Sequence, residues 1–249
     1  MHKENLVIVH SFPTNSTIMH GVKEFLDDYF NVYLVDLPGF NLNVPPLKSI
    51  SLNNFSNFLS DYIVSLGLDS YFLGGISFGY FIANNCKVDS KCKGIIAMEP
   101  YLNYDYLKFN PIKKIFLTAA VNIICGLKLH HLMYNSGLFH WYLSCEVPKK
   151  LTELTLHTID AYTFFETGKA ILQNNIAPHF HDKPYILFIN ENDTSICAKK
   201  IVPLFKNLKK TLIISTTSAH YPKDISKEYF SKTIGKSEIS NVVEFCRSC

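Results

Sequence analysis

Three side chains, far apart in the sequence, are of the types that nucleophilic catalysis needs. The first is Ser77, at the centre of Gly75-Ile76-Ser77-Phe78-Gly79 and just after the apolar run 71–74. This arrangement predicts a strand that turns sharply into a helix with the serine at the apex, where two glycines let strand and helix approach closely. Because glycine and serine are common in loops, the five residues alone are a weak pattern, and their surroundings must decide.

A serine hydroxyl needs a base to take its proton and a carboxylate to hold that base in place. His220 and Asp193 each follow a short apolar run late in the chain. An imidazole, with an ordinary pKa of about 6.5, suits the role of the base. We therefore predict Ser77 as nucleophile, His220 as general base and Asp193 as the carboxylate. Glu99, which also follows an apolar run, is the alternative acid.

The carbonyl oxygen becomes negative during attack and needs backbone N–H donors nearby, which form an oxyanion hole. Phe78 directly follows the serine, and Phe12 lies in the loop after the first apolar run, so we predict that their N–H groups are these donors. We also predict that His10, Phe12, Trp141 and Tyr142 contact the substrate, with the shaping of its own loop as the alternative role of His10.

Each predicted catalytic residue has a structural alternative. Ser77 would serve as an ordinary helix N-cap, Asp193 as a turn residue bonded to its own loop, and His220 as a loop histidine with one structural bond. In a parallel sheet, however, the loops after the carboxyl ends of the strands gather on one edge. The three residues can therefore meet in space, which favours the catalytic interpretation.

Apolar runs alternate along the chain with segments of helical spacing. We predict strands at residues 5–10, 32–35, 71–74, 94–98, 185–189 and 211–215, and helices at 16–30, 51–66, 77–85, 198–208 and 238–246. Nearly continuous apolar runs are typical of parallel strands buried on both faces. The pattern predicts an α/β fold with a mostly parallel sheet of about six strands flanked by helices.

The alternation is interrupted between residues 102 and 178, where no clear strand occurs and aromatic residues are frequent. An insertion of this length usually has a function of its own. We predict a helical cap, or lid, over residues 102–178 and an α/β core made of residues 1–101 and 179–249. The aromatic residues of the cap favour an apolar pocket beneath it.

Composition excludes several other classes of protein. The 249 residues are 47% hydrophobic with a net charge of +3, so there is no basic footprint for nucleic acid. The apolar runs 6–9 and 115–127 are too short or too interrupted for a signal peptide or a membrane span, which predicts a cytoplasmic protein without stable membrane insertion.

Seven scattered cysteines fit reduced thiols, and Cys246-x-x-Cys249 lacks the second pair of ligands that a zinc site needs. The sequence does not indicate an oligomeric state.

Over nearly its whole length the chain resembles serine hydrolases of the α/β-hydrolase fold, of the capped, esterase- or lipase-like kind. The resemblance rests on the elbow at Ser77, the loop His10-Ser11-Phe12-Pro13, the turn Asp36-Leu37-Pro38-Gly39, and the order serine, aspartate, histidine. It implies this fold without its first hairpin, since the chain begins at what resembles the third strand of the family. Two residues depart from the pattern: Ser11 stands where glycine is usual, and Tyr80 where a small residue is usual.

The predicted function is hydrolysis of a carboxylic ester with an apolar acyl or alcohol group, through an acyl-enzyme and without metal or organic cofactor. A thioesterase, a carbon–carbon bond hydrolase or an acyltransferase would use the same three residues. A non-catalytic, ligand-binding protein of the same fold is the alternative from another class, and the residues at positions 11 and 80 keep it open.

Overall fold

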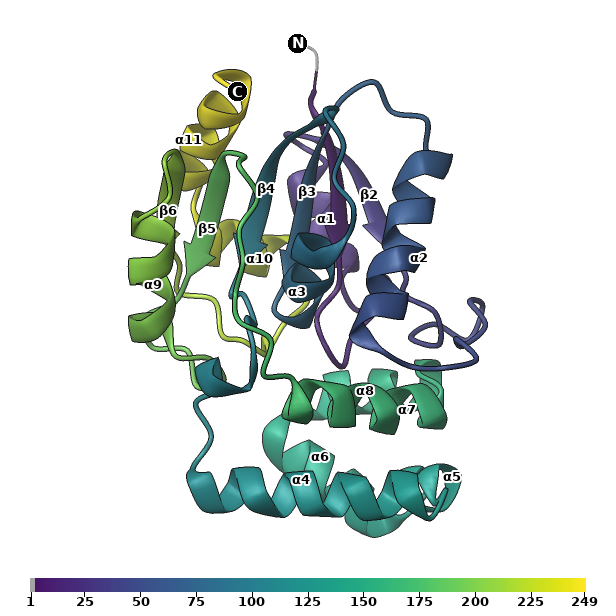
Figure 1. The fold of residues 1–249 in the computed structure, drawn as a ribbon. Helices are drawn as coiled ribbons and strands as arrows, with labels where there is room; N and C mark the ends of the chain where they lie inside the picture. The colour runs from purple at the N-terminus through teal and green to yellow at the C-terminus, as the bar shows by residue number, and fades with distance from the viewer. Residues whose placement is uncertain (1–2) are drawn as a thin grey trace.

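The computed structural model describes residues 3–249 and contains six strands. They are β1 (Asn5–Val9), β2 (Asn31–Val35), β3 (Tyr71–Ile76), β4 (Cys92–Met98), β5 (Tyr185–Ile189) and β6 (Thr211–Ser215). All five neighbouring pairs are parallel, in the order β2-β1-β3-β4-β5-β6 (Figure 1). The predicted α/β fold with a parallel sheet of six strands is confirmed.

The order of the strands reverses in the middle of the sheet. The chain starts at β1, moves outward to β2 and then returns to the opposite side of β1 to form β3. At the carboxyl end of β1, Val9 pairs with Val35 on one side and with Gly75 on the other. Ligands of open α/β sheets bind where the strand order reverses, so we expect a binding site beside the loops after β1 and β3.

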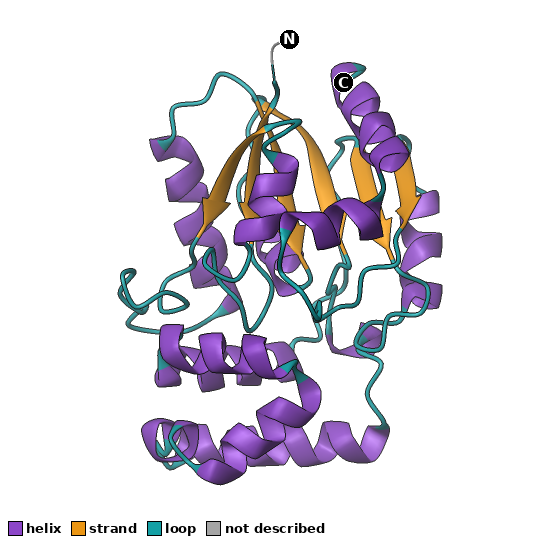
Figure 2. Cartoon of the chain, turned by 180° about the vertical axis from the view of Figure 1, so that it is seen from behind, coloured by secondary structure: helices purple, strands orange, loops and turns teal. Residues whose placement is uncertain are grey.

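Helices cover both faces of the sheet, as Figures 1 and 2 show from opposite sides. Those on one face, whose buried side chains join one apolar cluster with the sheet, are α1 (His20–Leu26), α10 (Lys227–Ile234) and α11 (Lys236–Arg247). Those on the other face are α2 (Leu52–Ser65), α3 (Phe78–Asn85) and α9 (Ala198–Lys206). Both faces of the sheet are therefore buried, which explains why its strands read as continuous apolar runs.

Two helices differ from the sequence prediction. The predicted helix over residues 16–30 is shorter, because the backbone N–H and the hydroxyl of Ser16 both donate to the carboxylate of Asp36, at 2.7 and 2.6 Å, and hold that segment as a loop. Helix α10 was not predicted. Only Phe230 and Ile234 of its eight residues are buried, which leaves little periodic signal.

Between β4 and β5 lie a short 3-10 helix, η1 (Tyr104–Tyr106), and five α-helices that we call the helical layer. These are α4 (Pro111–Gly126), α5 (His130–Tyr134), α6 (Gly137–Glu146), α7 (Lys149–Thr158) and α8 (Ala161–Gln173). The layer lies across the carboxyl edge of the sheet, with α7 and α8 nearer the sheet and α4 to α6 farther away (Figures 1 and 2). Anything that binds at this edge is therefore enclosed between the sheet and the helices.

The helical layer exposes many large apolar side chains on α4 to α6 and the turns between them. They are Ile112, Ile115, Phe116, Ile123, Leu127, Leu132, Leu138 and Trp141. Within residues 3–249, no helix combines the length and the apolar character that crossing a bilayer requires.

Candidate active site

Ser77 lies at a tight corner between β3 and α3. Its φ of 50° and ψ of −115° are rare for a residue other than glycine. The corner is held by its own backbone: the N–H of Ser77 donates to the carbonyl of Met98 at 2.8 Å, and its carbonyl accepts from the N–H of Tyr80 at 3.0 Å. The side chain does not cap α3, so the ordinary N-cap interpretation does not describe this serine.

The two glycines of the elbow are required by close contacts of the backbone. A Cβ atom on Gly75 would lie 2.3 Å from the carbonyl carbon of Gly79, and one on Gly79 would lie 2.3 Å from the carbonyl oxygen of His10. The first turn of α3 therefore packs directly against the loop after β1. This contact brings the side chains of Phe78 and Phe12 together, with ring centroids 6.4 Å apart.

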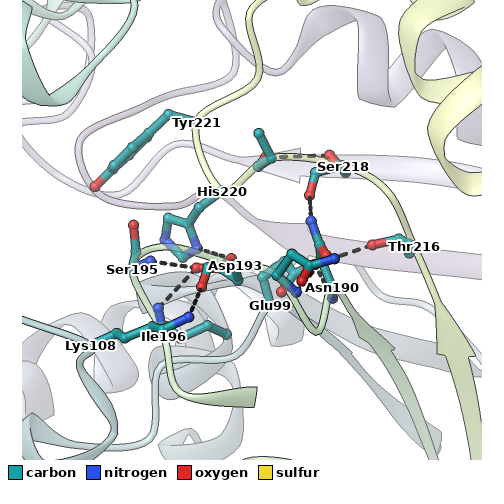
Figure 3. Close-up of polar contacts among 12 residues, drawn as sticks. Glu99, Lys108, Asn190, Asp193, Ser195, Ile196, Thr216, Ser218, His220 and Tyr221 are labelled. Carbon is teal, nitrogen blue, oxygen red and sulfur yellow. Dashed lines mark hydrogen bonds and ion pairs between the residues drawn. The ribbon is translucent and has the colours of Figure 1, made fainter. Parts of the chain in front are cut away.

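His220 and Asp193 meet across the loops that follow β6 and β5 (Figure 3). Nδ1 of His220 donates to Oδ2 of Asp193 at 2.9 Å, and both side chains are almost completely buried. The other oxygen of Asp193, Oδ1, accepts from the backbone N–H groups of Ser195 at 2.6 Å and Ile196 at 2.9 Å. The imidazole is thus oriented by a carboxylate that its own loop holds in position, and its Nε2 stays available.

The electrostatics of Asp193 suit a permanently ionised partner. Burial acts to raise the pKa of this carboxyl group, but the hydrogen bond and charge of His220 and the two backbone N–H donors outweigh it. The pKa of Asp193 therefore lies below its ordinary value, and the group is negative at neutral pH.

Glu99, the alternative acid, has a different set of partners. Its Oε1 accepts from the backbone N–H of Asn190 at 2.7 Å and from the hydroxyl of Thr216 at 3.2 Å (Figure 3). Burial, together with the nearby charge of Asp193, raises the pKa of Glu99 to about 9, so the group carries a proton at neutral pH. The carboxylate that contacts the histidine is that of Asp193, and Glu99 ties the loops after β5 and β6 to the end of β4.

A cavity of about 680 Å³ lies between the sheet edge and the helical layer. From the sheet side it is lined by Phe12, Ser77, Phe78, His220 and Tyr221. The layer contributes mainly apolar side chains, among them Phe116, Leu117, Val121, Ile124, Phe139, Phe164 and Ile171. Ser77 and His220 therefore face one large and mostly apolar space, of a size that suits a small-molecule ligand.

Three of the four predicted substrate-contacting residues line this cavity: Phe12, Trp141 and Tyr142. Trp141 is 66% exposed and so lies where the cavity reaches the surface. His10 does not line it, and this differs from the prediction. Its Nδ1 donates to the carbonyl of Ser11 at 2.9 Å, and its Nε2 accepts from the N–H of Leu37 at 3.1 Å. Both ring nitrogens of this buried residue are thus used to shape the loop after β1, and burial lowers its pKa.

Neither of the two unusual residues lines the cavity. The hydroxyl of Ser11 lies 3.0 Å from that of Thr14, inside the turn of its own loop. Tyr80, in the first turn of α3, is buried, and its ring packs against Phe205 with centroids 6.1 Å apart. Their bulk is accommodated in the protein interior and leaves the space before Ser77 open.

Two residues near the site were given no role from the sequence. Tyr221 lines the cavity, and its hydroxyl donates to the carbonyl of Phe12 at 3.5 Å, which links the histidine loop to the loop after β1. The ammonium group of Lys108 donates to the carbonyl of Asp193 at 2.9 Å. The adjacency of Tyr221 to His220 was the one available signal. The contact of Lys108 depends on how the helical layer docks.

Comparison with known proteins finds similar individual proteins, both among sequences and among solved structures. No protein-family model matches the chain. A pimeloyl-[acyl-carrier protein] methyl ester esterase from Wigglesworthia glossinidia brevipalpis is 28% identical over 234 residues, which cover 88% of this chain and 87% of that protein.

Solved structures match over almost the full length of the chain. A hydrolase from Oleispira antarctica superimposes with a TM-score of 0.70 at 14% identity, covering 98% of this chain and 92% of the other. An enol-lactonase from Burkholderia xenovorans LB400 gives 0.67 at 12% identity, with 99% and 92% coverage. A thermophilic esterase from Thermogutta terrifontis gives 0.64 at 16% identity, with 98% and 88% coverage. The chain thus has the α/β-hydrolase fold that the resemblance in its sequence predicted.

Proposed function

We propose that this protein is a serine hydrolase that cleaves a carboxylic ester with an apolar acyl or alcohol group. The observation that carries the proposal is the shared cavity: Ser77, at a strained corner, and His220, bonded to Asp193, line the same largely apolar space. The similarity to esterases and other hydrolases supports the same reaction class.

In the proposed reaction, the hydroxyl oxygen of Ser77 attacks the ester carbonyl while Nε2 of His220 takes the proton. Asp193 keeps the proton of the imidazole on Nδ1 and stabilises the cation that forms. The backbone N–H groups of Phe12 and Phe78 bind the oxyanion; that of Phe78 lies in the first turn of α3, where N–H groups have no acceptor within the helix. The alcohol leaves with the proton from His220, and water then releases the acyl group by the same steps in reverse.

The helical layer acts in this proposal as a cap over the site. We assign residues 102–178 to the cap and residues 1–101 and 179–249 to the α/β core. The cap supplies most of the apolar lining of the cavity, so it selects the apolar part of the substrate, while the core supplies the reacting groups.

A methyl ester of an acyl chain is the substrate class that we would test first. The relative from Wigglesworthia is named as an esterase of such a compound carried on an acyl-carrier protein. The cavity offers a long apolar surface for a chain, and the ion pair of Lys113 with Glu146, at 2.7 Å, gives it one polar region.

The test is to replace Ser77 by alanine and measure hydrolysis of a short-chain aryl ester and of an acyl methyl ester. We expect kcat to fall by at least about 10³-fold, because removal of the nucleophile leaves only binding and the oxyanion donors. Ser144→Ala, an exposed serine of α6, is the matched control and should keep wild-type rates. Wild-type rates in Ser77→Ala, with contaminating esterase excluded, would show that the mechanism is wrong.

Labelling by a fluorophosphonate distinguishes an enzyme from a binding protein. We expect one adduct, on the peptide that contains Ser77, in the wild type and none in Ser77→Ala. A folded wild-type protein that binds apolar esters without forming this adduct would support the ligand-binding alternative. Thioesterase, carbon–carbon bond hydrolase and acyltransferase activities share the adduct and would be separated by their rates with each substrate.

A further inference from the structure

A second group of reactive side chains lies within the helical layer and does not line the large cavity. Cys125 is near the end of α4, His130 begins α5, and Glu166 lies in α8. The thiol sulfur, a ring nitrogen and a carboxylate oxygen of these residues all lie within 4.8 Å of one another. Three different helices thus direct three potential metal ligands to one point.

The group is shielded from solvent. Cys125 and His130 are 7% and 6% exposed, and the side chain of Glu166 is 20% exposed. The ring of His130 also packs edge-on against Tyr162, with centroids 5.2 Å apart, and this contact fixes its orientation. The histidine is therefore held in place by packing, and Glu166 is the most exposed of the three ligands.

We propose that Cys125, His130 and Glu166 bind a divalent cation that prefers sulfur and nitrogen ligands, with Zn²⁺ as the best candidate. Zn²⁺ takes thiolate, imidazole and carboxylate ligands in tetrahedral geometry, with bonds of about 2.0 Å to nitrogen or oxygen and about 2.3 Å to sulfur. Two ligand atoms at about 2.0 Å from a tetrahedral centre are about 3.3 Å apart. Nε2 of His130 and Oε1 of Glu166 are already 3.2 Å apart.

The charges of the site also fit a divalent ion. A thiolate and a carboxylate together neutralise the two positive charges of Zn²⁺, so no net charge is buried. Lys169 lies 3.7 Å from Oε2 of Glu166, the oxygen that does not face the histidine. Such an outer partner orients a ligating carboxylate, and Oε1 is left for the metal. Water would complete the coordination from the partly exposed side of Glu166.

The position indicates what the metal would do. Ile124 and Phe165, the neighbours of Cys125 and Glu166 in the chain, line the large cavity. A metal bound here would fasten α4, α5 and α8 together behind the cavity wall. Its role would be structural and separate from ester cleavage, and the proposal does not depend on the activity of Ser77.

Without a metal, the same residues would form only a hydrogen-bonded group in which Glu166 contacts His130. Binding of Co²⁺ distinguishes a metal site from a group that is only hydrogen-bonded. We would strip the purified protein with a chelator, titrate it with Co²⁺ alone and follow the near-ultraviolet absorption of thiolate-to-cobalt charge transfer. We expect the band to saturate at one equivalent, to disappear on addition of Zn²⁺, and to be absent from Cys125→Ser.

Cys145→Ser, which alters an exposed cysteine of the same helical layer, is the matched control and should keep the band. Glu166→Gln keeps the thiol and should weaken Co²⁺ binding by more than about tenfold, so the test remains decisive if Cys125→Ser folds poorly. The melting temperature of the wild type should rise with Zn²⁺, and that of Glu166→Gln should rise less. Absence of the band from the wild type, or its persistence unchanged in both variants, would overturn the proposal.

Discussion

The carboxyl edge of the sheet and the helical layer build the same cavity by opposite means. At the sheet edge, reactive groups are fixed by hydrogen bonds: the carboxylate of Asp193 accepts three, and the corner at Ser77 is held through its own N–H and carbonyl. The layer contributes a wall that is mainly apolar and fixed by packing, as between Phe139 and Phe164, whose centroids are 5.2 Å apart. Hydrogen bonds are directional and packing is adaptable, so in the proposed reaction the sheet edge would fix the geometry for chemistry and the layer would select the substrate.

The two regions also differ at the surface. Phe116, Leu138 and Trp141 of the layer line the cavity and are nevertheless 65 to 66% exposed. The apolar wall therefore continues to the outside of the molecule, whereas the polar groups at Asp193 and His220 lie at its buried end. An apolar chain would enter along the layer and present its ester to Ser77.

The largest effect should come from the sheet side. Asp193→Asn keeps the size of the side chain but lets its amide donate to His220, which favours the wrong tautomer of the imidazole. We expect kcat to fall by about 10³- to 10⁴-fold with little change in KM, as for loss of the corresponding carboxylate in other enzymes of this type. Steady-state kinetics with a short aryl ester measures both parameters.

Glu99→Gln is the comparison for that experiment, because Glu99 is the second acid at the same edge. Its hydrogen bonds go to Asn190 and Thr216, which a glutamine oxygen can also accept. Its kcat should stay within about threefold of wild type. If Glu99→Gln instead lost activity and Asp193→Asn did not, the two acids would exchange the roles that we propose.

A smaller and more selective effect should come from the layer. Ala120 of α4 lines the cavity, so Ala120→Trp would fill part of the space that an acyl chain occupies. We expect kcat/KM to fall by about tenfold or more for a long-chain ester and by less than about threefold for an acetate, because loss of a few buried methylene contacts costs this much. A series of esters with increasing chain length measures the change.

Ala119→Trp is the matched control, since the neighbouring alanine is exposed and does not line the cavity. It should leave the preference for chain length unchanged. Equal losses for acetate and long-chain esters in Ala120→Trp would contradict the division of tasks between the sheet and the layer.

The contrast between the sheet edge and the helical layer also explains which features could be predicted from the sequence. Strands β5 and β6 were predicted to the residue from their short apolar runs. Every residue of β5 is buried, as a continuous apolar run predicts, whereas in the edge strand β6 only Ile214 is buried. The elbow at Ser77 was recognisable because local steric contacts require its two glycines. The loops that bear Asp193 and His220 could be assigned to the carboxyl edge of the sheet from the alternation of strands and helices alone. All of these signals are local or follow from the order of elements.

What could not be predicted depends on contacts between distant segments. For His10, substrate contact and shaping of its loop were both expected from the sequence, and the hydrogen bond from the N–H of Leu37 to its second nitrogen favours the loop. Asp193 was predicted as the partner of the histidine with Glu99 as the alternative, and the contact that distinguishes them is the hydrogen bond of His220 to Asp193, which joins the loops after β6 and β5. Within the helical layer no individual helix was predicted, although the side chains of Asn110, Ser136 and Asp160 cap the first turns of α4, α6 and α8.

A change of stability with pH tests how the sheet edge tolerates a second acid. Because burial raises the pKa of Glu99 from 4.5 to about 9, the folded protein keeps a proton that the unfolded chain releases. Stability should therefore fall as pH rises through this interval, by at most about 1.4 kcal/mol per pH unit. Glu99→Gln removes this dependence, so its melting temperature should exceed that of the wild type by a margin that grows from pH 5 to pH 8.

Glu191→Gln alters an exposed glutamate of the adjacent loop and should follow the wild-type curve. Parallel curves for Glu99→Gln and the wild type would mean that Glu99 is ionised in the folded protein beside Asp193. The sheet edge would then hold a second negative charge beside that of Asp193. The slope of stability against pH thus decides whether this edge holds one negative charge or two.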